Sequence, residues 1–244
     1  MQIVGVIPAR YDSSRYPGKP LADIHGKPMI QHVYERSRRA ARLDRLVVAT
    51  DDARILEAVE KFGGEALLTR SDHPSGTDRL AEAAGILGLA EDDVVINVQG
   101  DEPLVEPVMI ECLIEAIEQS SECPMATLAF VSENEVDYQS ANVVKVVVDE
   151  LGRALYFSRS PVPFRRDVSG EPLSFLKHLG FYAYRYGFLK LFTGLPPGRL
   201  ESLEKLEQLR VLEHGYAIQV ALSPVETHGV DTPEDLQRLM SLAR

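Results

Sequence analysis

Short apolar runs alternate with helical patterns through the first hundred residues, and this alternation constrains the fold more than any other feature. The runs cover residues 2–8, 45–50, 66–68 and 93–98. Between them, apolar side chains recur every three to four residues, as in helices packed on a sheet. This order predicts an α/β fold with an open, largely parallel sheet and helices on both faces. Ligands of such sheets bind beyond the carboxyl ends of the strands.

The second half of the chain is less regular, but it contains further apolar runs and helical patterns. We expect strands at 125–131, 143–148, 154–157, 179–184 and 218–222, an exposed loop at 160–175, and helices at 186–193, at 201–214 and after Asp231. The 201–214 segment is the strongest helical pattern of this half, because leucines recur through it at a period of three.

Length and composition indicate one α/β domain, residues 1–244, with room for an insert. No run of 18 apolar residues occurs, so we expect no membrane partner. The net charge of −11 argues against nucleic acid as a partner, because a phosphate backbone needs a basic face. A strand pattern follows Met1 with no basic leader, and the two cysteines suit a reducing compartment, so we expect a cytoplasmic protein.

A cationic loop follows the first strand pattern. Arg10, Arg15 and Lys19 lie within ten residues of one another, among serines, prolines and a glycine, in an otherwise acidic chain. Backbone N–H groups and fixed cations on such a loop suit a polyanion such as a triphosphate. The loop is not a P-loop, since Gly18-Lys19 precedes Pro20, and it lacks the G-x-G-x-x-G turn. The alternative is an ordinary solvated loop.

Two aspartates are candidate ligands of Mg²⁺, which prefers hard oxygen donors and usually takes one or two carboxylates. Asp101 directly follows the run 93–98, and the alternative for it is a turn-forming role. Asp231 precedes Thr232, which pairs with Asp235 in a pattern like a capping box. If Thr232 caps the helix, the Asp231 carboxylate is available to a metal; otherwise Asp231 is itself the cap.

A second polar loop, Ser75-Gly76-Thr77-Asp78-Arg79, opens a helix. Its small residues could contact a base or ribose, and Arg79 could reach a phosphate. Thr50, at the end of another strand pattern, could act similarly. In each case the alternative is an ordinary helix cap.

Several long motifs resemble one enzyme family. They are I-P-A-R-Y-D-S-S-R-Y-P-G-K-P-L at 7–21, S-G-T-D-R at 75–79, N-V-Q-G-D-E-P at 97–103, L-Y-F-S-R at 155–159, K-H-L-G at 177–180, L-E-K-L-E-Q-L-R at 203–210 and G-V-D-T-P-E-D-L at 229–236. Together they resemble the 3-deoxy-manno-octulosonate cytidylyltransferases, or CMP-Kdo synthetases, which activate acidic sugars. The segment 160–175 follows no pattern that we match to the family.

The resemblance implies a Rossmann-like open sheet of the nucleotide-diphospho-sugar transferase type, with residues 132–190 as an inserted lobe for sugar binding and dimerisation. It implies transfer of CMP from CTP to Kdo for lipopolysaccharide biosynthesis, with Mg²⁺ as cofactor and a homodimer as the assembly. Alternatives are 8-amino-Kdo or sialic acid as substrate. A non-enzymatic nucleotide- or sugar-binding protein would be favoured if Asp101 and Asp231 lay on opposite sides of the fold.

The resemblance also assigns residues to roles. Arg10, Lys19, Asp101 and Asp231 would be catalytic, and the two aspartates would hold the metal. The nucleotide would contact Pro8, Ala9, Arg10, Ser13, Arg15, Lys19, Thr50, Ser75, Gly76, Thr77, Arg79 and Gln99. The sugar would contact Gln99, Arg159, His178, Tyr182, Glu207 and Gln208. An arginine fork suits the sugar carboxylate, whereas the alternative for Glu207 is an ion pair with Arg210.

Overall fold

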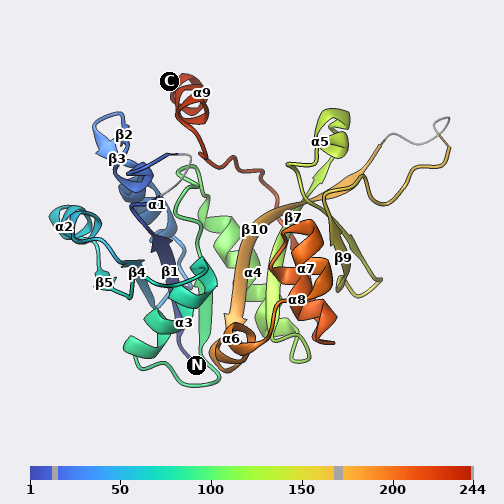
Figure 1. The fold of residues 1–244 in the computed structure, drawn as a ribbon, viewed down its shortest axis with the longest axis horizontal. Helices are drawn as coiled ribbons and strands as arrows, with labels where there is room; N and C mark the ends of the chain where they lie inside the picture. Colours follow the sequence, from blue (N-terminus) through green and yellow to red (C-terminus); the bar gives the residue numbers. More distant parts are fainter. Residues whose placement is uncertain (13–15, 168–172, 243–244) are drawn as a thin grey trace.

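The central sheet is the main feature of the computed structural model, which describes residues 1–12, 16–167 and 173–242 (Figure 1). From one edge to the other, its strands are β11 (Ile218–Leu222), β7 (Met125–Ser132), β10 (Phe175–Arg185), β6 (Val94–Asn97), β1 (Ile3–Ala9), β4 (Arg45–Thr50) and β5 (Ala66–Leu68). Neighbouring strands are parallel except at β10, which runs antiparallel to β6 and β7. The expected open, mostly parallel sheet is confirmed.

Helices pack on both faces because successive apolar side chains of each strand point to opposite sides. On β1, Ile3 and Ile7 enter one core, whereas Val4 and Val6 enter the other. The first core is covered by α1 (Met29–Ser37), α2 (Ala53–Lys61) and α4 (Pro107–Gln119), and the second by α3 (Gly76–Ile86), α6 (Tyr186–Gly194) and α8 (Gln208–Glu213). The three layers expected from the sequence are therefore present.

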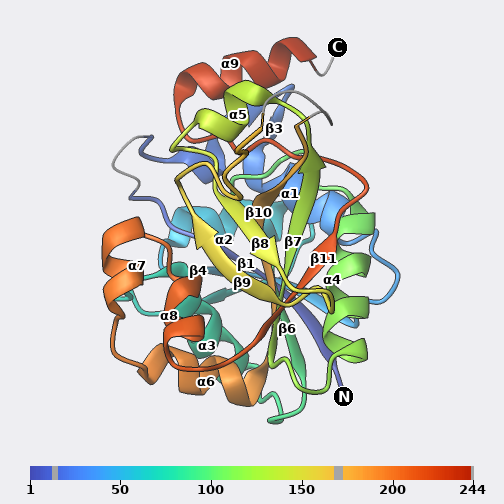
Figure 2. The same cartoon turned by 90° about the vertical axis from the view of Figure 1, so that its right-hand side faces the viewer.

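A hairpin of β8 (Lys145–Val148) and β9 (Ala154–Ser158) extends the sheet, because β8 pairs with the first half of β10. Figure 2 shows this hairpin toward the viewer, below the short helix α5 (Glu135–Gln139). Val146 and Phe157 join the second core. The expected lobe of residues 132–190 is thus only partly separate from the domain, since β10 lies in the middle of the main sheet.

The expected single helix over 201–214 is wrong. The chain forms α7 (Arg199–Glu204) and α8, and Lys205 between them adopts a left-handed conformation with φ of 55°. The Arg159 guanidinium accounts for the break, because its Nε donates to the Glu204 carbonyl at 2.7 Å and its Nη2 to the Lys205 carbonyl at 3.4 Å. These carbonyls lie at the C-terminus of α7, where no helical N–H groups follow to bind them, and the guanidinium takes that place.

The last helix, α9 (Pro233–Leu242), packs far from the strand that precedes it. Its Leu236 and Leu239 join a small cluster with Ile24, from the β2–β3 hairpin (Asp23–Ile24 and Lys27–Pro28), and with Met29. Figure 1 shows the connection crossing from β11 to the side of the molecule that carries β2 and β3. This crossing brings the residues just before α9 toward the loop after β1.

Candidate active site

Lys19 joins the two aspartates that the sequence singled out. Its Nζ lies 2.9 Å from Asp101 Oδ2 and 3.5 Å from Asp231 Oδ1. The three side chains help to line a cavity of about 190 Å³ at the carboxyl ends of β1 and β6, which is also lined by Pro8, Ala9, Arg10, Pro20, Gln99 and Gly100. Asp101 and Asp231 therefore lie on the same side of the fold, which argues against the non-enzymatic alternative.

Backbone contacts hold the two aspartates together. The Val230 N–H donates to the Asp101 carbonyl at 2.8 Å, so the linker before α9 is fixed to the turn after β6. Thr232 caps α9, since its Oγ1 accepts from the Asp235 N–H at 3.2 Å while Asp235 Oδ2 accepts from the Thr232 N–H at 3.0 Å. The expected capping box is confirmed, and the capping residue is Thr232 and not Asp231.

The turn that carries Asp101 lies against the carboxyl end of β1. A Cβ added to Gly100 would lie 2.8 Å from the Pro8 carbonyl oxygen, so a larger residue would force the two segments apart. Gly76, at the start of α3, is also close to Pro8, with 3.8 Å between the position of an added Cβ and Pro8 Cγ. Three loops that are distant in sequence therefore meet around Pro8.

The residues around this cavity fit a divalent metal. No group of three or more His, Cys, Asp and Glu side chains forms a metal site within the described ranges. Two carboxylates that converge on one cation nevertheless match Mg²⁺, which completes its octahedron with waters and substrate phosphates. Asp101 and Asp231 are the residues that could hold it.

Thr77 links the loop at the start of α3 to α8. Ser75 caps α3 by accepting from the Asp78 N–H at 3.2 Å, and the Thr77 hydroxyl donates to Glu207 Oε2 at 2.5 Å. Burial raises the pKa of Glu207, opposed by the Thr77 hydrogen bond. Arg210, the alternative partner of Glu207, lies 3.7 Å away and forms a closer pair with Glu201 at 2.6 Å.

Two predicted nucleotide contacts have structural partners instead. The Arg79 side chain is 5% exposed, and its guanidinium contacts Asp51 at 2.8 Å and Thr69 Oγ1 at 2.5 Å. Thr50 is fully buried, and its hydroxyl accepts from the Asp52 N–H at 3.2 Å. These protein partners hold both side chains in place, as is usual for buried polar groups, and contact with the nucleotide stays a prediction for each. Ser13 and Arg15 lie outside the described residues.

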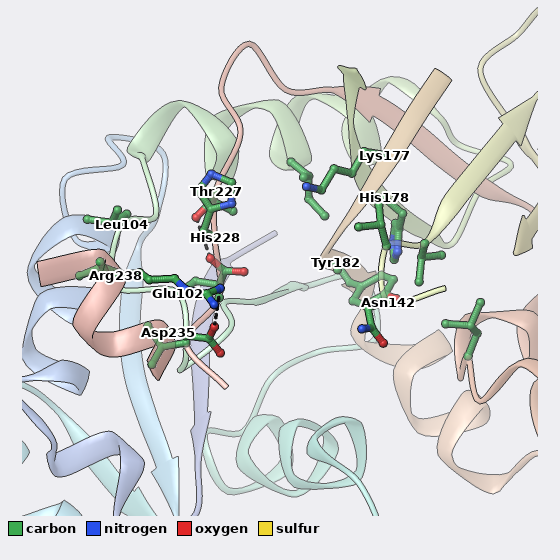
Figure 3. A pocket seen from close by; sticks show the side chains of 18 of the residues that line it. Glu102, Leu104, Asn142, Lys177, His178, Tyr182, Thr227, His228, Asp235 and Arg238 are labelled. Carbon is green, nitrogen blue, oxygen red and sulfur yellow. Dashed lines mark hydrogen bonds and ion pairs between the residues drawn. The ribbon is translucent and has the colours of Figure 1, made fainter. Parts of the chain in front are cut away.

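A larger cavity of about 660 Å³ opens between β10 and α9 (Figure 3). Its lining includes Glu102, Leu104, Asn142, Val143, Val144, Lys177, His178, Leu179, Gly180, Tyr182, Leu206, Gln208, Thr227, His228, Gly229, Val230, Asp235, Arg238 and Leu239. Three of the predicted sugar contacts, His178, Tyr182 and Gln208, are among them. Glu207 and Arg159 are not.

His178 lies at the wall of this cavity in a defined protonation state. Removal from water lowers its pKa to about 3, so the ring is neutral at neutral pH. The Thr127 hydroxyl donates its one hydrogen to the Phe181 carbonyl at 2.7 Å, and it lies 2.9 Å from His178 Nε2. The imidazole must therefore donate from Nε2, which leaves Nδ1 as an acceptor.

Two glutamines present amides near the cavities. Gln208 is 4% exposed, and its Nε2 is buried without a hydrogen-bond partner among the described residues. Gln99 lines the small cavity, and its Nε2 donates at 2.6 Å to the carbonyl of Gly180, which lines the large one. Gln99 thus lies between the two cavities.

The Arg159 guanidinium binds backbone carbonyls in this structure, and its predicted contact with the sugar carboxylate stays a prediction. All three guanidinium nitrogens donate to backbone carbonyls, at 2.7 Å to Glu204, 2.9 Å to Ala141 and 3.4 Å to Lys205. An arginine beside an irregular segment can thus bind the backbone of that segment. The side chain organises the segments around the cavity instead of lining it.

Sequence reasoning also missed polar residues at the other end of the cavity. Glu102 is 9% exposed, and burial raises its pKa to about 8, although Thr227 Oγ1 donates to it at 2.7 Å. Lys177 is held by Asp137 at 2.8 Å and by a second carboxylate, that of Glu226. Glu102 and Lys177 stand in the family motifs at 97–103 and 177–180, directly beside Asp101 and His178, and this adjacency was the available signal.

Comparison with known proteins agrees with this geometry. The family model for cytidylyltransferases matches residues 4–219. The chain belongs to the cytidylyltransferase family. Relatives of this cytidylyltransferase include a 3-deoxy-manno-octulosonate cytidylyltransferase of Syntrophobacter fumaroxidans, 69% identical over 98% of this chain and 96% of the relative. An 8-amino-3,8-dideoxy-manno-octulosonate cytidylyltransferase of Shewanella pealeana is 55% identical over 97% of this chain and 96% of the relative.

A solved structure also resembles this cytidylyltransferase over its whole length. It is a CMP:2-keto-3-deoxy-manno-octonic acid synthetase complexed with CTP, with a TM-score of 0.93, 45% identity and coverage of 100% of this chain and 98% of that one. The family resemblance and the fold class expected from the motifs are confirmed. In the described part of the chain, no helix is long and apolar enough to cross a membrane.

Proposed function

We propose that this cytidylyltransferase transfers CMP from CTP to Kdo, giving CMP-Kdo and pyrophosphate for lipopolysaccharide biosynthesis. The observation that carries the proposal is the convergence of Asp101 and Asp231, 130 residues apart, on Lys19 at the carboxyl ends of the strands. The relative that is 69% identical and the similar structure with bound CTP support the choice of substrates.

In the proposed reaction, the anomeric hydroxyl of Kdo attacks the α-phosphorus of CTP. A new P–O bond forms, the bond to the β-phosphate oxygen breaks, and the hydroxyl proton is lost to solvent. No covalent enzyme intermediate is needed, so positioning and charge stabilisation dominate. Arg10 and Lys19 offset charge on the departing pyrophosphate. Mg²⁺ held by Asp101 and Asp231 would supply further charge neutralisation at the phosphates.

The two cavities divide the substrates between them. The small cavity, with Pro8, Ala9 and the nearby Gly76, receives the nucleotide, and the large cavity receives the sugar. His178 Nδ1 accepts from a sugar hydroxyl, and Gln208 lies in the wall of the same cavity. Gln99 lies where the two substrates must meet.

Pyrophosphate release is the direct test. The protein is incubated with CTP and Mg²⁺, and Kdo, 8-amino-Kdo or sialic acid is added in parallel. Turnover should require Kdo and fall when UTP or ATP replaces CTP. Preference for 8-amino-Kdo would instead favour the activity named for the relative from Shewanella. Absence of turnover with every sugar, despite CTP binding, would contradict the enzymatic proposal.

We further propose a cytoplasmic homodimer that uses the lobe within residues 132–190. Leu151 and Leu155 on the β8–β9 hairpin are 69% and 61% exposed, which is unfavourable for a free surface. Sedimentation equilibrium should give twice the mass of 27.1 kDa, and Leu155→Asp should shift the protein toward the monomer. A monomeric wild type at micromolar concentration would rule this assembly out.

A further inference from the structure

One wall of the large cavity is a loop without regular structure, residues 140–144, between α5 and β8. Asn142, Val143 and Val144 of this loop line the cavity. A loop gives a less precise binding surface than a strand or helix unless other groups fix its backbone. The contacts behind this loop are therefore informative.

Lys145 fixes the loop from within the protein. Its side chain is fully buried, with a relative exposure of 0% for the residue. The Nζ donates to the carbonyls of Ser140 at 2.9 Å, Val143 at 2.7 Å and Arg159 at 2.6 Å. All three ammonium hydrogens are thus used on backbone carbonyls, an arrangement that satisfies a charge removed from water.

Arg159 also binds backbone carbonyls, in two segments that border the cavity. Its Nη1 donates to the Ala141 carbonyl at 2.9 Å, and its Nη2 donates to the Lys205 carbonyl at 3.4 Å. Lys205 directly precedes Leu206, which also lines the cavity. The carbonyls of residues 140, 141 and 143 consequently point to cations behind the wall.

With the backbone fixed in this way, the Asn142 side chain stands at the cavity. Figure 3 shows it on the same side as Tyr182. The Asn142 carboxamide has no hydrogen-bond partner among the described residues, whereas its backbone N–H donates to Ser140 Oγ at 3.3 Å. A carboxamide offers both donors and an acceptor, which matches the hydroxyl groups of a sugar.

We propose that Asn142 is a specificity-determining contact for a hydroxyl group of the sugar, and that Lys145 and Arg159 are positioning residues that hold it in place. This inference rests on the proposed function, because it assigns the sugar to the large cavity. It gives a role to a fully buried lysine that lines neither cavity. It also explains why the Arg159 guanidinium binds backbone carbonyls.

The test measures the KM for Kdo at saturating CTP, and the KM for CTP at saturating Kdo. Asn142→Ala should raise the KM for Kdo about three- to tenfold, the range expected when one neutral hydrogen bond is lost, and leave the KM for CTP unchanged. Asn142→Asp should raise the KM for Kdo further, because a carboxylate then faces an anionic sugar. Asn142 is exposed, so these variants retain the fold.

Lys145→Met tests the positioning role, since it keeps the length of the side chain but frees three carbonyls. It should raise the KM for Kdo at least as much as Asn142→Ala, with little change in the KM for CTP. Val59→Ala removes a buried side chain of α2 and is the control for lost stability. It should leave both KM values unchanged. If Lys145→Met does not fold, the Asn142 variants still test whether Asn142 contacts the sugar.

The outcomes separate the two proposals. A wild type that does not release pyrophosphate from CTP and Kdo overturns the proposed function, and this inference with it. A wild type that turns over, together with an Asn142→Ala variant of unchanged KM for Kdo, overturns the inference alone. Equal increases in both KM values for Lys145→Met would also overturn the positioning role.

Discussion

The hydroxyl of Thr77 donates a 2.5 Å hydrogen bond to the carboxylate of Glu207, 130 residues further along the chain. Thr77 belongs to the loop that opens α3 beside Pro8, and Glu207 precedes α8, whose first residue, Gln208, lines the large cavity. The proposed nucleotide and sugar sites are thus connected by one partly buried hydrogen bond. Loss of this bond should affect both substrates.

We expect Thr77→Ala and Glu207→Ala to show strong coupling in a double-mutant cycle. The interaction energy from urea unfolding should be about 1–2 kcal/mol, because a partly buried bond to a carboxylate is stronger than one between neutral groups. Thr77→Ser keeps the hydroxyl and should stay close to wild type. Additive single-variant effects would show that the bond contributes nothing.

Asp101→Asn and Asp231→Asn should each lower kcat by about a hundredfold or more, the scale seen when one preorganised electrostatic group is removed at a reacting centre. CTP should still bind in part, through Arg10 and Lys19, as measured by calorimetry. Asp92→Asn, an exposed carboxylate next to the start of β6, is the matched control. Normal Mg²⁺-dependent turnover by the Asp231→Asn protein would contradict the shared site.

Arg79→Met should lower stability much more than it changes nucleotide binding. The substitution leaves the partly buried Asp51 without its cation; a fully buried pair would lose about 3–5 kcal/mol, and this pair should lose about 2–3 kcal/mol. Arg54→Met breaks an exposed pair with Asp52 close by, and it should change stability little. A folded Arg79→Met protein with a greatly raised KM for CTP would restore the phosphate contact that the sequence suggested.

His178 should make the folded protein sensitive to acid. Its pKa is about 3 in the folded state and 6.5 in the unfolded chain, so the neutral form is favoured by folding. The resulting stability is complete above pH 6.5 and is lost progressively as the pH falls toward 3. Between pH 7 and 5, the loss attributable to this residue is about 2 kcal/mol.

Urea unfolding of wild type and His178→Gln at pH 7 and pH 5 measures this contribution. Carboxylates elsewhere also respond to pH, but they do so equally in both proteins. Their contribution therefore cancels in the difference between wild type and variant. The wild type should lose more free energy of unfolding than the variant over this interval. An identical loss in both proteins would mean that His178 titrates normally in the folded state.

The sequence alone determined the layers of the fold and the location of the active edge. Strand runs such as 45–50 are apolar on both faces, and their order with the helices leaves few topologies for the chain. Parallel strands direct their carboxyl ends to one edge, so the order of the strands is enough to place Asp101 near the cationic loop. Local chemistry also indicated the pairing of Thr232 with Asp235, which spans only three residues, although the choice between Thr232 and Asp231 as the cap came from the structure.

Only the tertiary structure decided how individual cations are used. In the sequence, Arg79 and Arg159 are indistinguishable from ligand-binding residues and Lys145 carries no signal, because their partners are distant in sequence or are backbone carbonyls. The break at Lys205 is hidden for the same reason, since the 201–214 pattern is locally helical and the Arg159 guanidinium that binds there follows β9, about 45 residues earlier in the chain. The periodicity of apolar residues indicates only local secondary structure. A buried polar group needs a hydrogen-bond partner, and tertiary packing decides which residue that partner is.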